Sequence, residues 1–291
     1  MKFGLAYANT IPFTDPGPAK ELVVAAEEVG FESVWTVEHV IWPHEYDSVY
    51  PYHPTGKMPG TPEVPIPDPL VWLTWIAAVT SRIRLGTGVM ILPLRNPLVL
   101  AKQLATLDHL SGGRMELGIG AGWLEEEFDA VGVPFGGRGR RVDETIDAMR
   151  LLWSETSASF AGEVFSFEGV ALNPKPDGGE IPIVVGGQSN AAIRRTVARG
   201  DGFYPGPDSL AELERIIGAL HDACEAAGRD AGEIEISAAF PGRFLDDPVG
   251  AVEVMADLGV DRMMVPTYPI ARAGIGPGME LMAEIIGDHA A

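Results

Sequence analysis

Glu38 and His39 stand side by side just after a short apolar run, Ser33–Thr36, that is typical of a buried strand. Imidazole gains and loses a proton near neutral pH, and a neighbouring carboxylate can orient it, so the pair could serve acid–base chemistry. An isolated histidine is more often a structural hydrogen-bonding group, and the position at a strand end is what favours His39. We predict catalytic roles for both residues. None of the six histidines forms a His-x-His or His-Glu-x-x-His pattern, so we predict no metal site.

Three other apolar runs that we predict to be strands end in glycines. They form the exits Gly86-Thr87-Gly88, Gly120-Ala121-Gly122 and Gly186-Gly187. Glycine lets backbone approach a ligand closely. Tight strand–helix turns would explain the first two exits equally well, because both lack the third glycine of a dinucleotide-binding fingerprint. The third exit continues through Gln188 into a helix that carries Arg194, and free N–H groups at a helix start bind phosphate. We predict cofactor contacts along these exits.

A proline-rich segment begins at His39 and ends at Pro67, with seven prolines and several aromatic residues. The prolines exclude a helix, and the aromatic residues argue against disorder. Loops of this length are usually functional. We predict an ordered lid over about 40–67, with an interface loop as the alternative. Trp42, Tyr50 and the more distant Trp123 are expected to line an apolar pocket for substrate, although such aromatic residues are as often part of a core.

Eight strand-like runs alternate with helical patterns along the chain, and they would have to position these residues. Helix starts are marked by a capping residue followed by proline, as in Asp68-Pro69, Asn96-Pro97 and Asp247-Pro248. We predict an α/β fold, a single TIM (β/α)8 barrel, with an open doubly wound sheet as the alternative. The expected strands are Lys2–Ala8, Ser33–Thr36, Ile83–Leu85, Met115–Ile119, Ile181–Val185, Gly202–Tyr204, Ile234–Ala238 and Arg262–Val265.

One further segment interrupts the alternation. After the fourth expected helix, Arg140–Trp153, aromatic and aliphatic residues alternate loosely around two glycines over about 156–176, which predicts a hairpin-like insertion. No linker divides the chain, so we predict one domain over 1–291. In a barrel the carboxyl ends of all strands meet at one end, and this would bring His39 and the glycine exits together.

Composition narrows the class of protein. The net charge of −20 argues against nucleic acid as a partner, since binding it needs basic patches. The single cysteine, Cys224, excludes a disulfide within the chain and fits a reducing compartment. The N-terminus lacks the apolar region of a signal peptide, and no window reaches the roughly 18 apolar residues of a membrane helix. We expect a cytoplasmic protein with a small-molecule substrate and no membrane contact.

The chain also resembles the bacterial luciferase-like monooxygenase superfamily over essentially its whole length, and within it the enzymes that use the deazaflavin coenzyme F420. The resemblance rests on the order and spacing of short motifs: Glu38-His39, Ser48–Tyr52, Asp68-Pro-Leu, Arg84–Val89, Ala105–Asp108, Ser111–Arg114, Gly118–Trp123, Arg138-Gly139 with Asp143-Glu144, and Gly200–Gly202. It implies a TIM barrel with an insertion and a homodimer. It also implies a non-proline cis peptide at Gly88-Val89 beneath the cofactor ring.

The resemblance implies roles for individual residues. The ring would lie on Gly88-Val89 and beside Gly120, Ala121 and Gly122, the phosphate on Gly186-Gly187 with Gln188 and Arg194, and His39 near the reactive ring carbon. Strand ends rich in glycine and aromatic residues suit a flat cofactor that carries the chemistry. Sugar-phosphate dehydrogenases of this family have an acidic residue where Trp123 stands, which favours a neutral or apolar substrate here.

Three functions follow from these observations. The first is an F420-dependent oxidoreductase that passes a hydride between the deazaflavin and a small organic substrate. The second is an FMN-dependent monooxygenase of the same fold, because the two rings have nearly the same shape. The third is a non-catalytic protein that binds a flavin or deazaflavin.

Overall fold

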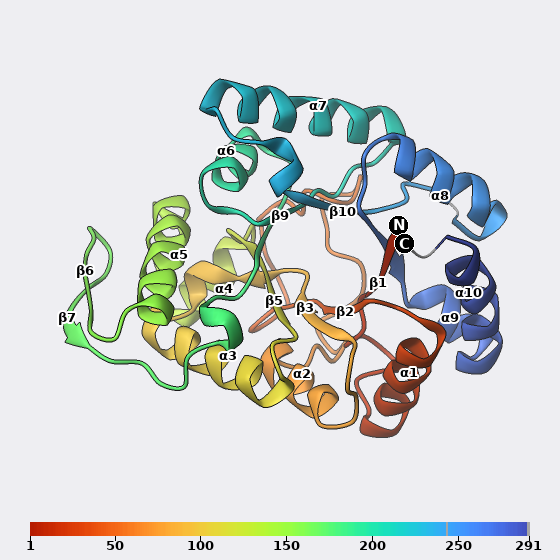
Figure 1. Cartoon of the computed structure of the whole chain (residues 1–291), viewed down its shortest axis with the longest axis horizontal. Helices are drawn as coiled ribbons and strands as arrows, with labels where there is room; N and C mark the ends of the chain where they lie inside the picture. The colour runs from red at the N-terminus through yellow and green to blue at the C-terminus, as the bar shows by residue number, and fades with distance from the viewer. Residues whose placement is uncertain (243, 290–291) are drawn as a thin grey trace.

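The eight barrel strands close into a ring in the part of the chain that the computed structural model describes, residues 1–242 and 244–289. Every neighbouring pair is parallel, and the pairings of β3 with β5 and of β11 with β1 close the sheet (Figure 1). The predicted TIM barrel is therefore confirmed, and the open sheet is excluded. In ring order the strands are β1 (Lys2–Ala6), β2 (Ser33–Thr36), β3 (Arg84–Thr87), β5 (Met115–Gly120), β8 (Ile183–Gly186), β9 (Gly202–Tyr204), β10 (Glu235–Ala239) and β11 (Arg262–Pro266).

Helices surround this ring and bury their apolar faces against it. The predicted capping pairs start helices as expected: the Asp68 side chain accepts the N–H groups of Leu70 and Val71, and Asn96 does the same one helix later. The helices are α1 (Pro16–Val29), α2 (Pro69–Ala77), α3 (Pro97–Ser111), α4 (Glu125–Val131), α5 (Arg138–Ser154), α6 (Asn190–Arg199), α7 (Leu210–Ala227), α8 (Pro248–Asp257), α9 (Tyr268–Ala273) and α10 (Ile275–His289). That residues 1–291 form one domain stays a prediction.

Short elements account for most differences from the expected order. The two-residue strand β4 (Met90–Ile91) extends the sheet beside β5, and a 3-10 turn follows at Leu92–Leu94. Helix α9 lies between β11 and the last helix, where no helix was expected. Elements this short complete fewer than two turns, so hydrophobic periodicity cannot reveal them.

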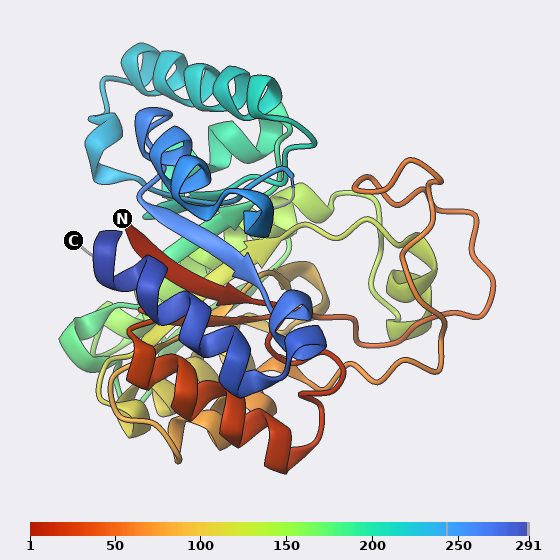
Figure 2. The same ribbon diagram turned by 90° about the vertical axis from the view of Figure 1, so that its right-hand side faces the viewer.

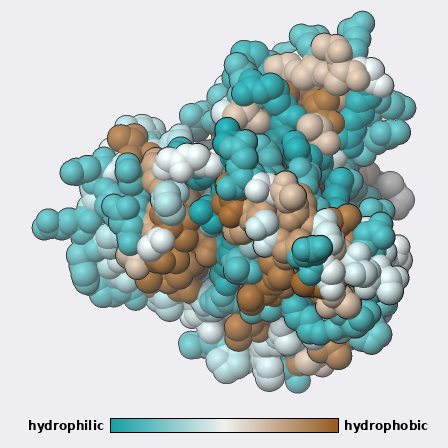
Figure 3. All heavy atoms as spheres, turned by 90° about the vertical axis from the view of Figure 1, so that its left-hand side faces the viewer, coloured by the Kyte–Doolittle hydropathy of each residue, from teal (hydrophilic) through white to brown (hydrophobic). Residues whose placement is uncertain are grey.

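The insertion is an antiparallel hairpin of β6 (Ala158–Ala161) and β7 (Ser166–Val170), as predicted, and it lies outside the ring of helices (Figure 1). The Glu144 carboxylate of α5 accepts the backbone N–H groups of Glu163, Val164 and Phe165 and so ties the hairpin tip to the barrel. The face on this side is mostly hydrophilic, with apolar residues gathered in patches near its middle (Figure 3).

The lid is the segment between β2 and α2, and it contains turns and extended chain but no helix or strand. It stands out from one end of the barrel, whereas β1 begins and α10 ends at the other (Figure 2). Asn9 joins both ends of the lid, because its amide donates to the carbonyls of Val37 and Pro67 and accepts the Val37 N–H. The segment predicted over about 40–67 thus lies at the carboxyl ends of the strands, and its role as a lid or as an interface loop stays a prediction.

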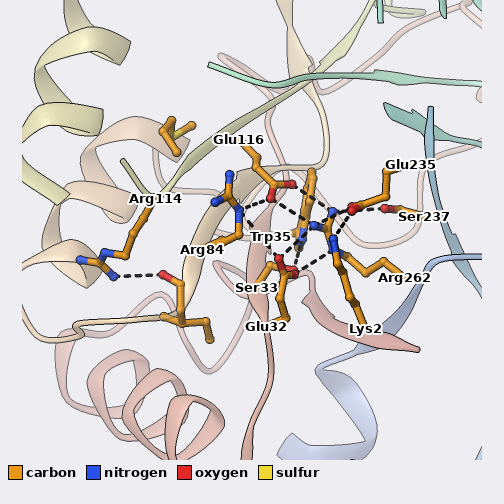
Figure 4. Close-up of polar contacts among 12 residues, drawn as sticks. Lys2, Glu32, Ser33, Trp35, Arg84, Arg114, Glu116, Glu235, Ser237 and Arg262 are labelled. Carbon is orange, nitrogen blue, oxygen red and sulfur yellow. Dashed lines mark hydrogen bonds and ion pairs between the residues drawn. The ribbon is translucent and has the colours of Figure 1, made fainter. Parts of the chain in front are cut away.

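The opposite end of the barrel is closed by charged side chains (Figure 4). Arg262, at the start of β11, pairs with Glu116, Glu32 and Glu235, which come from three other places around the ring. Its guanidinium also lies 5.2 Å from the ring of Trp35. Because barrel sites lie at the other end, this network serves the stability of the fold.

Candidate functional site

Val89 forms the floor of the barrel mouth. A Cβ atom added at Gly186 would lie 2.5 Å from one Val89 methyl carbon, and one added at Gly120 would lie 2.7 Å from the other. These two glycines therefore leave room for a side chain from a third strand exit. The peptide bond between Gly88 and Val89 is cis, as the family resemblance implied. The resulting floor consists of backbone and one aliphatic side chain, a surface that fits a flat ring.

Tyr204, at the end of β9, borders this floor. Its ring meets Trp35 edge to face with centroids 6.1 Å apart, and it lies 3.2 Å from the Cβ position of Gly88. Burial, with a smaller contribution from Tyr7, raises the pKa of Tyr204 above its ordinary value of 10. The phenol therefore stays neutral at physiological pH and can act there only as a hydrogen-bonding group.

His39 is held by a buried carboxylate that sequence reasoning missed. The Nδ1 atom of His39 lies 2.9 Å from Oε2 of Glu127 on α4, whose side chain is fully buried. The other oxygen of Glu127 accepts the N–H groups of Val40 and Ile41. Glu127 was missed because a run of three glutamates at a helix start is typical of solvated residues that favour the helix dipole.

Glu38 turns away from His39 into its own ion pair. One oxygen pairs with Arg95, and the other accepts the Ile91 N–H. Burial raises the pKa of Glu38, although Arg95 and the Ile91 N–H act in the opposite direction. Arg95 also contacts Asp68, the cap of α2. These partners engage both carboxylate oxygens, so the geometry favours a role for Glu38 in positioning the β2 exit, and its predicted catalytic role stays untested.

Trp123 joins the lid to the site. Its ring makes edge contacts with His39, Tyr46 and Tyr50, with centroid distances of 5.9, 5.7 and 5.1 Å. The structure therefore brings together two of the three residues predicted to bind substrate, Trp123 and Tyr50. The third, Trp42, packs within the lid itself, where its ring lies 3.2 Å from the Cβ position of Gly60.

The third glycine exit is already partly covered by the lid. The Tyr52 ring lies 3.2 Å from the Cβ position of Gly206, and its hydroxyl lies 3.7 Å from that of Gly187. The Gly187 N–H donates to the Tyr204 carbonyl, and the Gln188 side chain accepts the Gly206 N–H. A phosphate at this exit would therefore use other amide groups near the start of α6. Arg194 is exposed on that helix.

Two hollows in the surface differ in their distance from the strand ends. One of about 200 Å³ lies at the base of the lid and is lined by Glu38, His39, Asp68 and Arg95 among others. A larger one, about 420 Å³, lies between α3, α5 and the segment after β7, away from the strand ends. Only the first belongs to the candidate site.

Within 1–242 and 244–289, no three histidine, cysteine or acidic side chains gather as metal ligands would. Over the same ranges, no helix has the length and apolar character needed to cross a membrane.

Comparisons with known proteins agree with this geometry. A family model described as luciferase-like monooxygenase matches residues 1–276. The F420-dependent glucose-6-phosphate dehydrogenase of Kineococcus radiotolerans is 34% identical over 255 residues, which are 86% of this chain and 70% of that protein. The crystal structure of the monooxygenase RslO1 from Streptomyces bottropensis matches with a TM-score of 0.77 and 25% identity over 100% of both chains.

A further solved structure shares the fold. An F420-dependent secondary alcohol dehydrogenase in complex with an F420–acetone adduct matches with a TM-score of 0.79 and 18% identity over 98% of both chains. The relatives thus include F420-dependent oxidoreductases and a monooxygenase. Because the family model matches residues 1–276, the chain belongs to the luciferase-like monooxygenase family.

Proposed function

We propose that the protein is an oxidoreductase that uses coenzyme F420 and passes a hydride between the deazaflavin and a small, neutral or apolar organic substrate. The observation that carries the proposal is the floor of Val89 between Gly120 and Gly186, with His39 held near the mouth by Glu127. When bound, the deazaflavin supplies the hydride donor or acceptor. The F420-dependent relatives support this cofactor over FMN.

The residues of this chain would hold the cofactor and manage the proton. Val89 and the flanking glycines would support the ring from below, and the exits of β8 and β9 would take its phosphate. His39 would donate or accept the proton that accompanies hydride transfer, a contribution of roughly 10²–10⁴ in rate. Tyr50 and Trp123, held together at the lid, would exclude water from the ring and bind an apolar substrate.

Trp123 supports the proposed class of substrate. Its indole is uncharged and makes edge contacts with the imidazole and with two tyrosine rings of the lid. A charged phosphate ester would gain nothing from such a wall, whereas a small alcohol or ketone would lie against it. Trp123→Ala should therefore raise KM for such a substrate more than it lowers kcat.

A fluorescence titration with both cofactors tests the proposal. Coenzyme F420 should bind to the purified protein, and His39→Ala should leave that binding within about threefold while lowering turnover by at least about tenfold. Micromolar binding of FMN without any binding of F420 would overturn it.

The second candidate is an FMN-dependent monooxygenase, and the match to RslO1 favours it. Oxygen consumption with reduced FMN separates the two functions. A protein that binds either cofactor tightly but turns over no substrate would instead support the third possibility, non-catalytic binding. We also propose, from the family resemblance and composition, a cytoplasmic homodimer.

A further inference from the structure

We propose that Glu127 is the positioning residue that sets which nitrogen of His39 carries the proton, an inference that rests on the proposed function for its catalytic consequence. The contact joins residues 88 positions apart, from the β2 exit and the first turn of α4. His39 is 11% exposed at its side chain, and Glu127 is fully buried. The pair is therefore a buried contact at the barrel mouth.

Both oxygens of the Glu127 carboxylate make hydrogen-bond contacts. Oε1 of Glu127 accepts the N–H groups of Val40 and Ile41, and Oε2 faces Nδ1 of His39. Because Oε1 of Glu127 acts as an acceptor toward the backbone N–H groups, we take Oε2 to be an acceptor as well and place the hydrogen on Nδ1, which donates it. The tautomer follows: Nε2 is the nitrogen left to take up or release a proton.

In other proteins, carboxylates hydrogen-bond catalytic or metal-binding histidines in the same way and fix their orientation and tautomer. The Trp123 ring also contacts the imidazole, with centroids 5.9 Å apart and an interplanar angle of 82°. The charged groups near His39 besides Glu127 are Glu38, Asp68 and Arg95, which share a hollow with it. Arg95 pairs with both of those acids, so Glu127 is the carboxylate that contacts the imidazole itself.

Glu127→Gln separates positioning from folding. The amide oxygen can still accept the N–H groups of Val40 and Ile41, which keeps the local backbone in place. The amide nitrogen then faces Nδ1 and donates to it, so the hydrogen of the imidazole moves to Nε2. Glu126→Gln is the matched control, because Glu126 stands in the same helical turn and accepts the N–H groups of Asp47 and Ser48 in the lid.

Nitrogen-15 NMR of histidine-labelled protein without cofactor reads the tautomer directly, and a His39→Asn sample assigns the signal. Wild type and Glu126→Gln should show the hydrogen on Nδ1, and Glu127→Gln should show it on Nε2. With F420 bound, Glu127→Gln should lower turnover at least about tenfold while the Kd for F420 changes less than about threefold.

The outcomes are distinct. A hydrogen on Nε2 in wild type, or an unchanged tautomer in Glu127→Gln, overturns the inference whatever cofactor binds. Full turnover in Glu127→Gln despite the changed tautomer overturns its catalytic consequence. Failure of F420 to bind wild type would instead overturn the proposed function and leave the tautomer result standing.

Discussion

Nη1 of Arg262 lies 2.9 Å from Oε2 of Glu116, and the two side chains are only 1% and 6% exposed. The pair joins β11 to β5 across the interior of the barrel at the end opposite the lid (Figure 4). Glu32 and Glu235 also pair with the guanidinium. Arg262 thus holds carboxylates from around the ring. Arg84 is a second cation that pairs with Glu32 and Glu116.

Arg262→Met should destabilise the protein strongly. The substitution leaves the buried Glu116 with Arg84 as its remaining ion-pair partner among the described residues, and breaking a buried ion pair from one side costs about 3–5 kcal/mol. Urea denaturation measures the free energy of unfolding. The control is Arg140→Met, which removes an exposed pair with Glu163 and should cost only about 0–1 kcal/mol. Equal losses in the two variants would show that the buried network does not have this role.

Gly186→Ala should impair the floor of the site. The new Cβ would lie 2.5 Å from a Val89 methyl carbon and 3.1 Å from the Ile119 carbonyl oxygen, so Val89 must move. Overpacking of this kind costs about 1–3 kcal/mol, and binding of F420 should weaken by at least about tenfold on the proposed function. Thermal unfolding and the fluorescence titration measure the two effects.

Gly218 in α7 provides a control for this glycine-to-alanine substitution. No atom lies within 4 Å of the Cβ position of Gly218 except its own helix and neighbours. Gly218→Ala should stabilise the helix by up to about 1 kcal/mol and leave cofactor binding unchanged. Unchanged binding in Gly186→Ala as well would argue against Val89 as the support of the ring.

The lid should loosen in acid through Glu126. Burial acts to raise the pKa of this carboxyl, but hydrogen bonds from the Ser48 hydroxyl and from lid N–H groups lower it to about 2. Because the pKa in the folded protein lies below the ordinary 4.5, the hydrogen bonds of Glu126 contribute fully to the stability of the lid above about pH 4.5. This contribution is lost as the pH falls toward about 2.

Hydrogen exchange at the Asp47 and Ser48 amides, which donate to Glu126, measures this effect. After correction for intrinsic rates, protection should fall as the pH is lowered from about 4.5 toward about 2 in wild type. In Glu126→Gln the amide oxygen can still accept both N–H groups and does not titrate, so protection should persist and be nearly independent of pH over this range. Loss of protection with falling pH in that variant as well would show that another group causes the effect.

The protein should form a homodimer in solution, as its family resemblance implies. Light scattering coupled to size exclusion should give twice the chain mass of 31.1 kDa at micromolar concentration. A mass of one chain over the whole accessible concentration range would contradict this expectation.

Local sequence determined much of the fold. Asp68-Pro69 and Asn96-Pro97 start helices because an acceptor side chain followed by proline satisfies a helix N-terminus with residues only a few positions apart. The glycine exits and the hairpin were predictable for the same reason, since each depends on the conformation of a few consecutive residues. The motif order also identified the family, and with it the barrel.

Only the tertiary structure decided the contacts within the site. Which acid faces His39 depends on how α4 lies against the β2 exit, and closure of the ring placed Glu127 there and turned Glu38 to Arg95. The same closure put Val89 between Gly120 and Gly186. Sequence could mark these residues as strand ends and glycine turns. It could not pair them, because hydrogen bonds and packing between distant segments arise only when the whole barrel is formed.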